Sequence, residues 1–179
     1  MARHVAPHAK DYMEITLDQL LASRESRQAK QMALQSAHPS HTLVCLTVIM
    51  PGAVKRNLHS LIVANAALTA VLECFREKLV DIEVRDLVTG YEAYLVVDLD
   101  ALTAKELTCG IEDSHPLGRL FDLDVLGHDG APLSRAQVSR PARQCLLCEH
   151  ESRWCMRNHT HTQAELQERI TQMVEEYVR

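Results

Sequence analysis

Residues 112–126 read Glu-Asp-Ser-His-Pro-Leu-Gly-Arg-Leu-Phe-Asp-Leu-Asp-Val-Leu, and the second half of this stretch predicts a strand that follows a glycine turn. Because side chains alternate across a strand, Asp122 and Asp124 share one face, roughly 7 Å apart at their α-carbons, while their apolar neighbours face a core. Repulsion between the two acids raises the pKa of at least one of them unless a cation lies between them. Mg²⁺ accepts one or two carboxylates together with phosphate oxygens. The pair is therefore a candidate Mg²⁺ site for phosphoryl or nucleotidyl transfer, and an exposed acidic strand edge is the alternative.

The rest of the chain predicts helices and strands around this strand. Thr16 with Gln19, and Thr162 with Glu165, form capping boxes, which are typical of helix starts. The predicted helices cover residues 17–37, 57–79, 101–107 and 162–178, and the other predicted strands cover 42–50, 82–88, 92–98 and 108–112. Helices and strands do not alternate regularly, so the order predicts an α+β fold with a single mixed sheet flanked by helices. We expect residues 1–179 to form one domain.

Length and composition are those of an ordinary globular protein, with 179 residues of which 46% are hydrophobic and 24% charged. The formal net charge of −5 argues against broad nucleic-acid binding, which normally needs a basic face. Residues 1–10 do not resemble a signal peptide, and the apolar run at 43–50 is far too short to span a bilayer. We therefore expect a cytoplasmic protein that binds neither nucleic acid nor membrane.

Three of the six cysteines lie close together near the C-terminus, followed by a histidine. Cys145, Cys148, Cys155 and His161 have the spacing C-x2-C-x6-C-x5-H, with His159 as a competing fourth ligand. Three thiolates and one imidazole suit a tetrahedral, structural Zn²⁺ site, which would join residues 144–161 to the last helix. The alternatives are three ordinary free cysteines or, less in keeping with its position, a redox Cys-x-x-Cys pair.

Several of these motifs together resemble the citrate lyase holo-acyl-carrier-protein synthases, which are apo-citrate lyase phosphoribosyl-dephospho-CoA transferases. The resemblance is carried by His-Pro-Leu-Gly-Arg-Leu-Phe-Asp-Leu-Asp-Val-Leu at 115–126, Ser134-Arg135, Arg143 before the Cys-Leu-Leu-Cys pair, Leu-Leu-Ala-Ser-Arg-Glu-Ser-Arg from Leu20, Pro51-Gly52 with Lys55, and Thr89-Gly90. Two positions depart from the family pattern, Met50 in place of Asn and Asn158-His159-Thr160 in place of a Ser-Arg run. The second departure leaves His161 as the better metal-ligand candidate.

The resemblance implies transfer of the 2′-(5″-triphosphoribosyl)-3′-dephospho-CoA prosthetic group to a serine of the acyl carrier (gamma) subunit of citrate lyase, with release of diphosphate. It also suggests roles for the candidate residues. Asp122 and Asp124 would hold Mg²⁺, and His115 would orient or deprotonate the serine. The residues expected to bind or approach the phosphates are Gly118, Arg119, Arg135, Arg143 and Lys55.

A related family, the malonate decarboxylase transferases, carries a glycine turn followed by Asp-x-Asp, as polymerase-β-type nucleotidyltransferases do. Gly118-Arg119 stands here where that superfamily usually has Gly-Ser, so a nucleotidyltransferase-like fold is expected by analogy. A third metal carboxylate could come from Glu112 or from Asp98-Leu-Asp100, although acids before a helix favour a capping role. Two other functions stay open: a transferase for the malonate decarboxylase carrier, and a non-catalytic, zinc-containing assembly module for citrate lyase.

Overall fold

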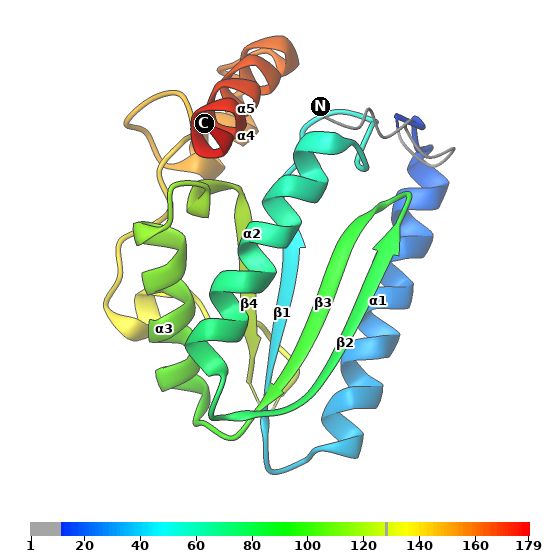
Figure 1. Ribbon diagram of the computed structural model, residues 1–179, viewed down its shortest axis with the longest axis vertical. Coiled ribbons are helices and arrows are strands. Elements are labelled where there is room, and N and C mark those ends of the chain that lie inside the picture. Colours follow the sequence, from blue (N-terminus) through cyan, green and yellow to red (C-terminus); the bar gives the residue numbers. More distant parts are fainter. Residues whose placement is uncertain (1–11, 128) are drawn as a thin grey trace.

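Four strands form one sheet in the order β2-β3-β1-β4 (Figure 1), in a computed structural model that describes residues 12–127 and 129–179. The strands are β1 (Thr42–Val48), β2 (Leu79–Leu87), β3 (Gly90–Val97) and β4 (Phe121–Leu126). Every neighbouring pair is antiparallel. The sheet is therefore antiparallel rather than mixed, because the β2–β3 hairpin places β3 between β1 and β2, the two strands that run parallel.

Helices surround this sheet and confirm the α+β class. Those in the described residues are α1 (Leu17–Ala37), α2 (Leu58–Phe75), α3 (Ala101–Ser114), α4 (Ser152–Asn158) and α5 (Gln163–Val178), with 3-10 helices η1 (Gly118–Leu120) and η2 (Arg135–Val138). The capping boxes predicted at Thr16 and Thr162 are both confirmed at the starts of α1 and α5. Asp100 accepts a hydrogen bond from Thr103 N at 2.9 Å and caps α3, the role expected for an acid before a helix.

The strand predicted at residues 108–112 is wrong, because these residues form the second half of α3. The buried positions of α3 recur every three or four residues, which is the helical period. Gly110 lies inside this helix, with open space where a side chain would lie. Five residues with mixed propensities are too few to distinguish a strand period from a helical one.

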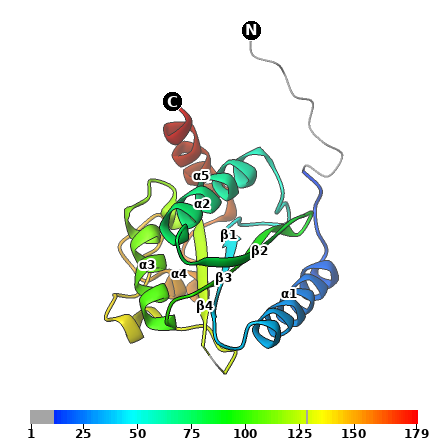
Figure 2. The same cartoon turned by 60° about the horizontal axis from the view of Figure 1, so that its bottom comes forward.

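The two faces of the sheet carry different layers (Figure 1, Figure 2). α2 covers one face, with α3 beside β4 and with α5 packed against α2 at the end of the sheet, and the main core lies between these helices and the sheet (Figure 1). α1 covers the other face, where a smaller apolar cluster contains Cys45 and Tyr94. Because Asp122 pairs with Thr47 and Asp124 pairs with Cys45 across the β1–β4 ladder, both acids lie on the α1 face.

α2 is apolar and long enough, by length and composition alone, to cross a membrane. Its position in the fold accounts for this composition, since it packs on the sheet and contributes Val63, Val71 and Phe75 to the main core. A helix that packs against a sheet in the core of a protein has the same apolar character as a membrane-spanning helix.

Candidate active site and metal centre

Asp122 and Asp124 project from one face of β4, as the alternation predicted, while Phe121, Leu123 and Val125 are buried in the main core. Asp122 accepts a hydrogen bond from Thr47 Oγ1 at 3.1 Å, and its side chain is 46% exposed. Burial, followed by the charge of Asp122, raises the pKa of Asp124. The two carboxylates therefore repel one another, and their hard oxygen donors fit a divalent cation such as Mg²⁺.

Charged side chains bond the outer edge of β4, which pairs with no further strand among the described residues. Leu123 N donates to Glu112 Oε1 at 2.9 Å, and the Leu123 carbonyl accepts from Lys105 Nζ at 3.1 Å. Arg143 donates to the Phe121 carbonyl. Because buried backbone groups need partners, these three side chains fix the strand that carries the two acids.

Arg135 and Arg143, two of the expected phosphate ligands, both pair with the buried Glu112. Arg135 Nη1 lies 2.9 Å from Glu112 Oε2, and its Nη2 bonds both oxygens of Asp113 at 2.6 and 2.7 Å. Arg143 Nη2 lies 2.6 Å from Glu112 Oε1, while its Nη1 lies 4.0 Å from Asp122 Oδ1. Glu112 thus holds two arginines in place, and Arg143 reaches from Glu112 toward the acid pair.

Replacing Glu112 with alanine should lower the free energy of unfolding by about 3–5 kcal/mol, because breaking a buried ion pair leaves the partner charges uncompensated. Urea unfolding followed by circular dichroism measures this loss. Asp113→Ala is the matched control: Asp113 is 42% exposed, so its pair with Arg135 should contribute at most about 1 kcal/mol. Equal, small losses in the two variants would contradict the structural role assigned to Glu112.

The turn before β4 packs tightly against the end of α3. A Cβ on Gly118 would lie 2.4 Å from the carbonyl oxygen of Glu112, so the missing side chain allows two protein backbones to approach each other. The Nδ1 atom of His115 accepts from Leu117 N at 3.0 Å, its ring packs against Phe121, and burial lowers its pKa. Neither Gly118 nor His115 lines the cavity described below.

Cys145, Cys148, Cys155 and His161 come together as the spacing predicted, with one ligand atom of each within 4.8 Å of the others. Cys148 Sγ lies 3.4 Å from Cys155 Sγ and 3.3 Å from His161 Nε2. Burial opposes ionisation of Cys145, but backbone N–H groups at Leu147 and Cys148 lower its pKa to about 7. Three thiols and one imidazole in this arrangement can bind a metal ion.

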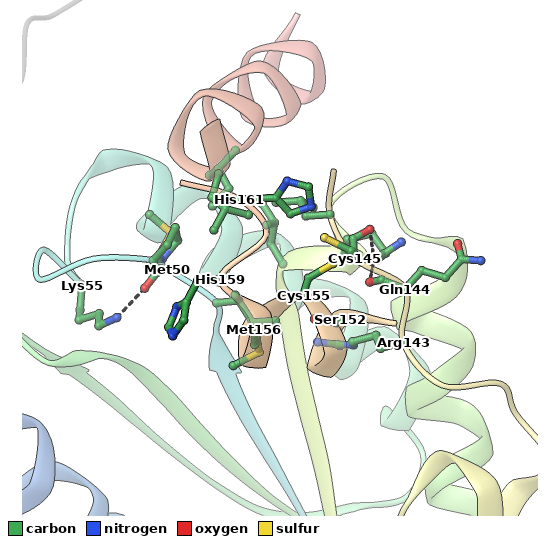
Figure 3. Close-up of a pocket in the computed structure, with 17 residues that line it drawn as sticks. Met50, Lys55, Arg143, Gln144, Cys145, Ser152, Cys155, Met156, His159 and His161 are labelled. Carbon is green, nitrogen blue, oxygen red and sulfur yellow. Dashed lines mark hydrogen bonds between the residues drawn. The ribbon is translucent and has the colours of Figure 1, made fainter. Parts of the chain in front are cut away.

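A cavity of about 440 Å³ opens beside this Cys/His cluster, at the end of the sheet where β1 ends and β4 begins (Figure 3). Its volume falls within the range of small-molecule sites, about 300–1,000 Å³. Its apolar wall consists of Ile49, Met50, Pro51, Leu120, Leu146, Met156, Leu166 and Ile170. Lys55, Arg119, Arg143 and His159 also line it, and the lining contains no acidic residue. The cavity therefore has the charge and wall chemistry for an anion with an apolar portion.

Arg119 lines this cavity and is held by the loop of the Cys/His cluster. Its Nη2 atom donates to the carbonyl oxygens of Gln144 and, at 2.9 Å, Cys145. Its Nε atom is buried without a hydrogen-bond partner. Burial, followed by the nearby charge of Arg143, lowers the pKa of Arg119. Two crowded guanidinium groups of this kind are stabilised by an anion between or beside them.

Lys55 and His159 lie toward the opposite side of the cavity from Arg143 (Figure 3). Lys55 Nζ donates to the Met50 carbonyl at 2.6 Å, and burial lowers the pKa of Lys55. His159 ends α4 with a left-handed backbone (φ 47°). The structure therefore places His159 on the cavity and His161 in the Cys/His cluster, as the comparison of the two candidates predicted.

Two features of the site were absent from the sequence-based hypothesis. The pairing of Glu112 with two arginines needs contacts between residues more than 20 positions apart, and the Glu-Asp doublet at 112–113 gave no sign of them. The carbonyl groups that hold Arg119 carry no side-chain signature. The sequence signal for them is their position at Cys145, the first cysteine of the predicted metal site, because a bound metal would fix the directions of the carbonyl groups in this loop.

The family model and the similar proteins that match this chain all point to one family. The family model described as apo-citrate lyase phosphoribosyl-dephospho-CoA transferase matches residues 15–177. The protein of that name from Citrobacter koseri is 35% identical over 166 residues, which cover 91% of this chain and 90% of the relative. A probable apo-citrate lyase phosphoribosyl-dephospho-CoA transferase from Vibrio cholerae is 39% identical over 169 residues, covering 92% of this chain and 94% of the relative.

Proposed function

Because the chain belongs to the apo-citrate lyase phosphoribosyl-dephospho-CoA transferase family, we propose that it transfers the phosphoribosyl-dephospho-CoA group to a serine of the citrate lyase acyl carrier subunit. The family match over residues 15–177 carries this proposal. The donor is triphosphoribosyl-dephospho-CoA, and the reaction is of the nucleotidyltransferase type. In it, the serine oxygen forms a bond to the α-phosphorus, the bond to diphosphate breaks, and the hydroxyl proton is released.

Asp122 and Asp124 are the proposed ligands of Mg²⁺. Their shared strand face and the raised pKa of Asp124 support this assignment, since a bound cation would relieve the repulsion between them. When bound, Mg²⁺ neutralises charge that develops on phosphate oxygens. The two carboxylates would fix the position of the ion, and the hydrogen bonds along the outer edge of β4 hold the strand that carries these carboxylates in place.

The cavity cations are the proposed phosphate-binding groups. Arg143 joins the two parts of the site, because it lines the cavity and also lies 4.0 Å from Asp122. Arg119 and Lys55 line the same cavity, where an anion would offset their burial. Arg135 forms ion pairs with both Glu112 and Asp113, so we assign it to positioning Glu112 rather than to phosphate contact. Gly118 and His115 would then shape the turn that leads into β4.

The Cys/His cluster is the proposed site of a structural Zn²⁺. Its donor set of three thiols and one imidazole has no open position for a substrate, which is typical of structural zinc. The bound ion would supply folding energy to residues 144–161 and no reaction step. We propose that residues 1–179 form one transferase domain and that it acts in the cytoplasm.

The intact mass of the apo acyl carrier subunit, measured after incubation with this protein, Mg²⁺ and triphosphoribosyl-dephospho-CoA, tests the function. We expect a gain of one phosphoribosyl-dephospho-CoA group, together with release of diphosphate. Modification of the malonate decarboxylase carrier alone would instead assign the related transferase function. Carrier binding without any mass gain, from a folded and metal-loaded protein, would favour a non-catalytic assembly module.

A further inference from the structure

α4 forms an exposed surface next to the cavity that the transfer reaction described above does not explain. Trp154 is 48% exposed and Met156 is 71% exposed, although both are large apolar side chains. Arg153 and Arg157 are exposed on the same short helix. Tryptophan, methionine and arginine are the residue types that are enriched in protein interfaces and their energetic centres.

The two arginines of α4 differ from Arg135 and Arg143, which hold Glu112. Arg135 and Arg143 form ion pairs with buried or half-exposed acids. Arg153 and Arg157 form no ion pair within residues 12–127 and 129–179. Two exposed and unpaired guanidinium groups on a protein with a net charge of −5 mark a local basic surface that complements carboxylates of a partner.

The position of α4 connects this surface with the reaction site. Met156 and Ser152 line the cavity, and Cys155, between the exposed residues, belongs to the Cys/His cluster (Figure 3). A macromolecular acceptor must bring its serine to the donor phosphates, so its docking surface has to adjoin the cavity. α4 meets this requirement, and a bound metal at Cys155 would hold the helix rigid.

We propose that Arg153, Trp154, Met156 and Arg157 form the docking surface for the acyl carrier subunit. The complementary surface that this requires of the carrier has acidic side chains and an apolar patch beside the serine that is modified. This inference rests on the proposed function. The competing surface is the apolar strip on edge strand β2, formed by Val80, Ile82 and Val84, which are 46%, 36% and 43% exposed. That strip lies on the opposite side of β3 and β1 from β4 and lines no part of the cavity.

Trp154 is the single tryptophan of the chain, so its fluorescence reports directly on this surface. Titration of the full-length, metal-loaded protein with apo carrier should change the emission of Trp154, and the measured Kd should rise with salt because exposed charges are screened. The double variant Arg153→Glu/Arg157→Glu should raise both this Kd and the KM for carrier by about tenfold or more. The KM for triphosphoribosyl-dephospho-CoA should stay unchanged.

Two matched variants complete the test. Arg76→Glu changes an exposed arginine that caps the C-terminal end of α2, and should leave both KM values unchanged. That end of α2 lies at the opposite end of the sheet from α4 (Figure 1). Ile82→Asp tests the β2 strip. Docking on α4 is refuted if the α4 double variant, with normal metal content and thermal midpoint, modifies carrier with an unaltered KM, or if Ile82→Asp alone raises that KM. Either result leaves the transfer function intact, whereas failure of the wild-type protein to modify carrier would reject the function itself.

Discussion

Transfer to the carrier should fall roughly a thousandfold when Asp122 is replaced by asparagine, because loss of a metal carboxylate removes several kcal/mol of charge stabilisation and each ~1.4 kcal/mol is a factor of ten. The change keeps the shape of the side chain and its contact with Thr47. Since Asp122 is nearly half exposed, the thermal midpoint should change little. The measurement is the initial rate of carrier mass gain at saturating donor and Mg²⁺.

Asp98→Asn is the matched control for this variant. Asp98 and Asp100 form a second Asp-x-Asp in the sequence, but Asp100 caps α3. Both residues follow β3 at the end of the sheet where Val97 pairs with Thr42, whereas Asp122 pairs with Thr47 near the other end of β1. The control should therefore retain full activity. A normal rate in Asp122→Asn would reject the metal assignment.

In metal-free protein, the same variant should also lower the pKa of Asp124, since the charge of Asp122, one of the two main causes that raise this pKa, is removed.

Loss of the zinc ion proposed for the Cys/His cluster is expected to have the largest effect on stability. Structural zinc contributes folding energy directly, so Cys155→Ser should lower the thermal midpoint by about 10 °C or more, at roughly 2–4 °C per kcal/mol for a chain of this length. Differential scanning calorimetry and the zinc content of the purified protein measure the effect. Cys74→Ser is the control, because Cys74 is exposed and lies outside the cluster.

Loss of this metal should also weaken donor binding. Arg119 is held by the carbonyl groups of Gln144 and Cys145, and these groups lie in the loop that the metal would fix. We therefore expect the metal-depleted protein, at a temperature where the sheet is still folded, to show a raised KM for donor. A zinc-free preparation with unchanged stability and unchanged KM would show that the four side chains bind no structural ion.

The sequence was most informative where a short local pattern determines the structure. Alternation placed Asp122 and Asp124 on one face of β4, Thr16 and Thr162 began helices, and the cysteine spacing predicted the cluster in which Cys145, Cys148, Cys155 and His161 lie together. Each of these depends on residues a few positions apart, or on the demanding geometry of a ligand set.

Prediction failed where distant residues decide the outcome. Residues 108–112 are helical because α3 buries one of its faces beside β4, and their local sequence does not contain that contact. The seven-residue helix α4 was missed because it lies inside the cysteine segment and is too short to show a period. The role of Glu112 depends on Arg135 and Arg143, which only the tertiary fold brings near.

The side chains that occupy the outer edge of β4 also limit how copies of this protein can associate. With Lys105, Glu112 and Arg143 bonded to its backbone, β4 offers no free template to which another chain could add a strand. Growth of the sheet into an aggregate is thus directed to β2, the opposite edge. Charged side chains on β2, which are Asp81, Glu83, Arg85 and Asp86, disfavour addition of a strand there. Both edges of the sheet are therefore protected, β4 by side chains bonded to its backbone and β2 by charged side chains.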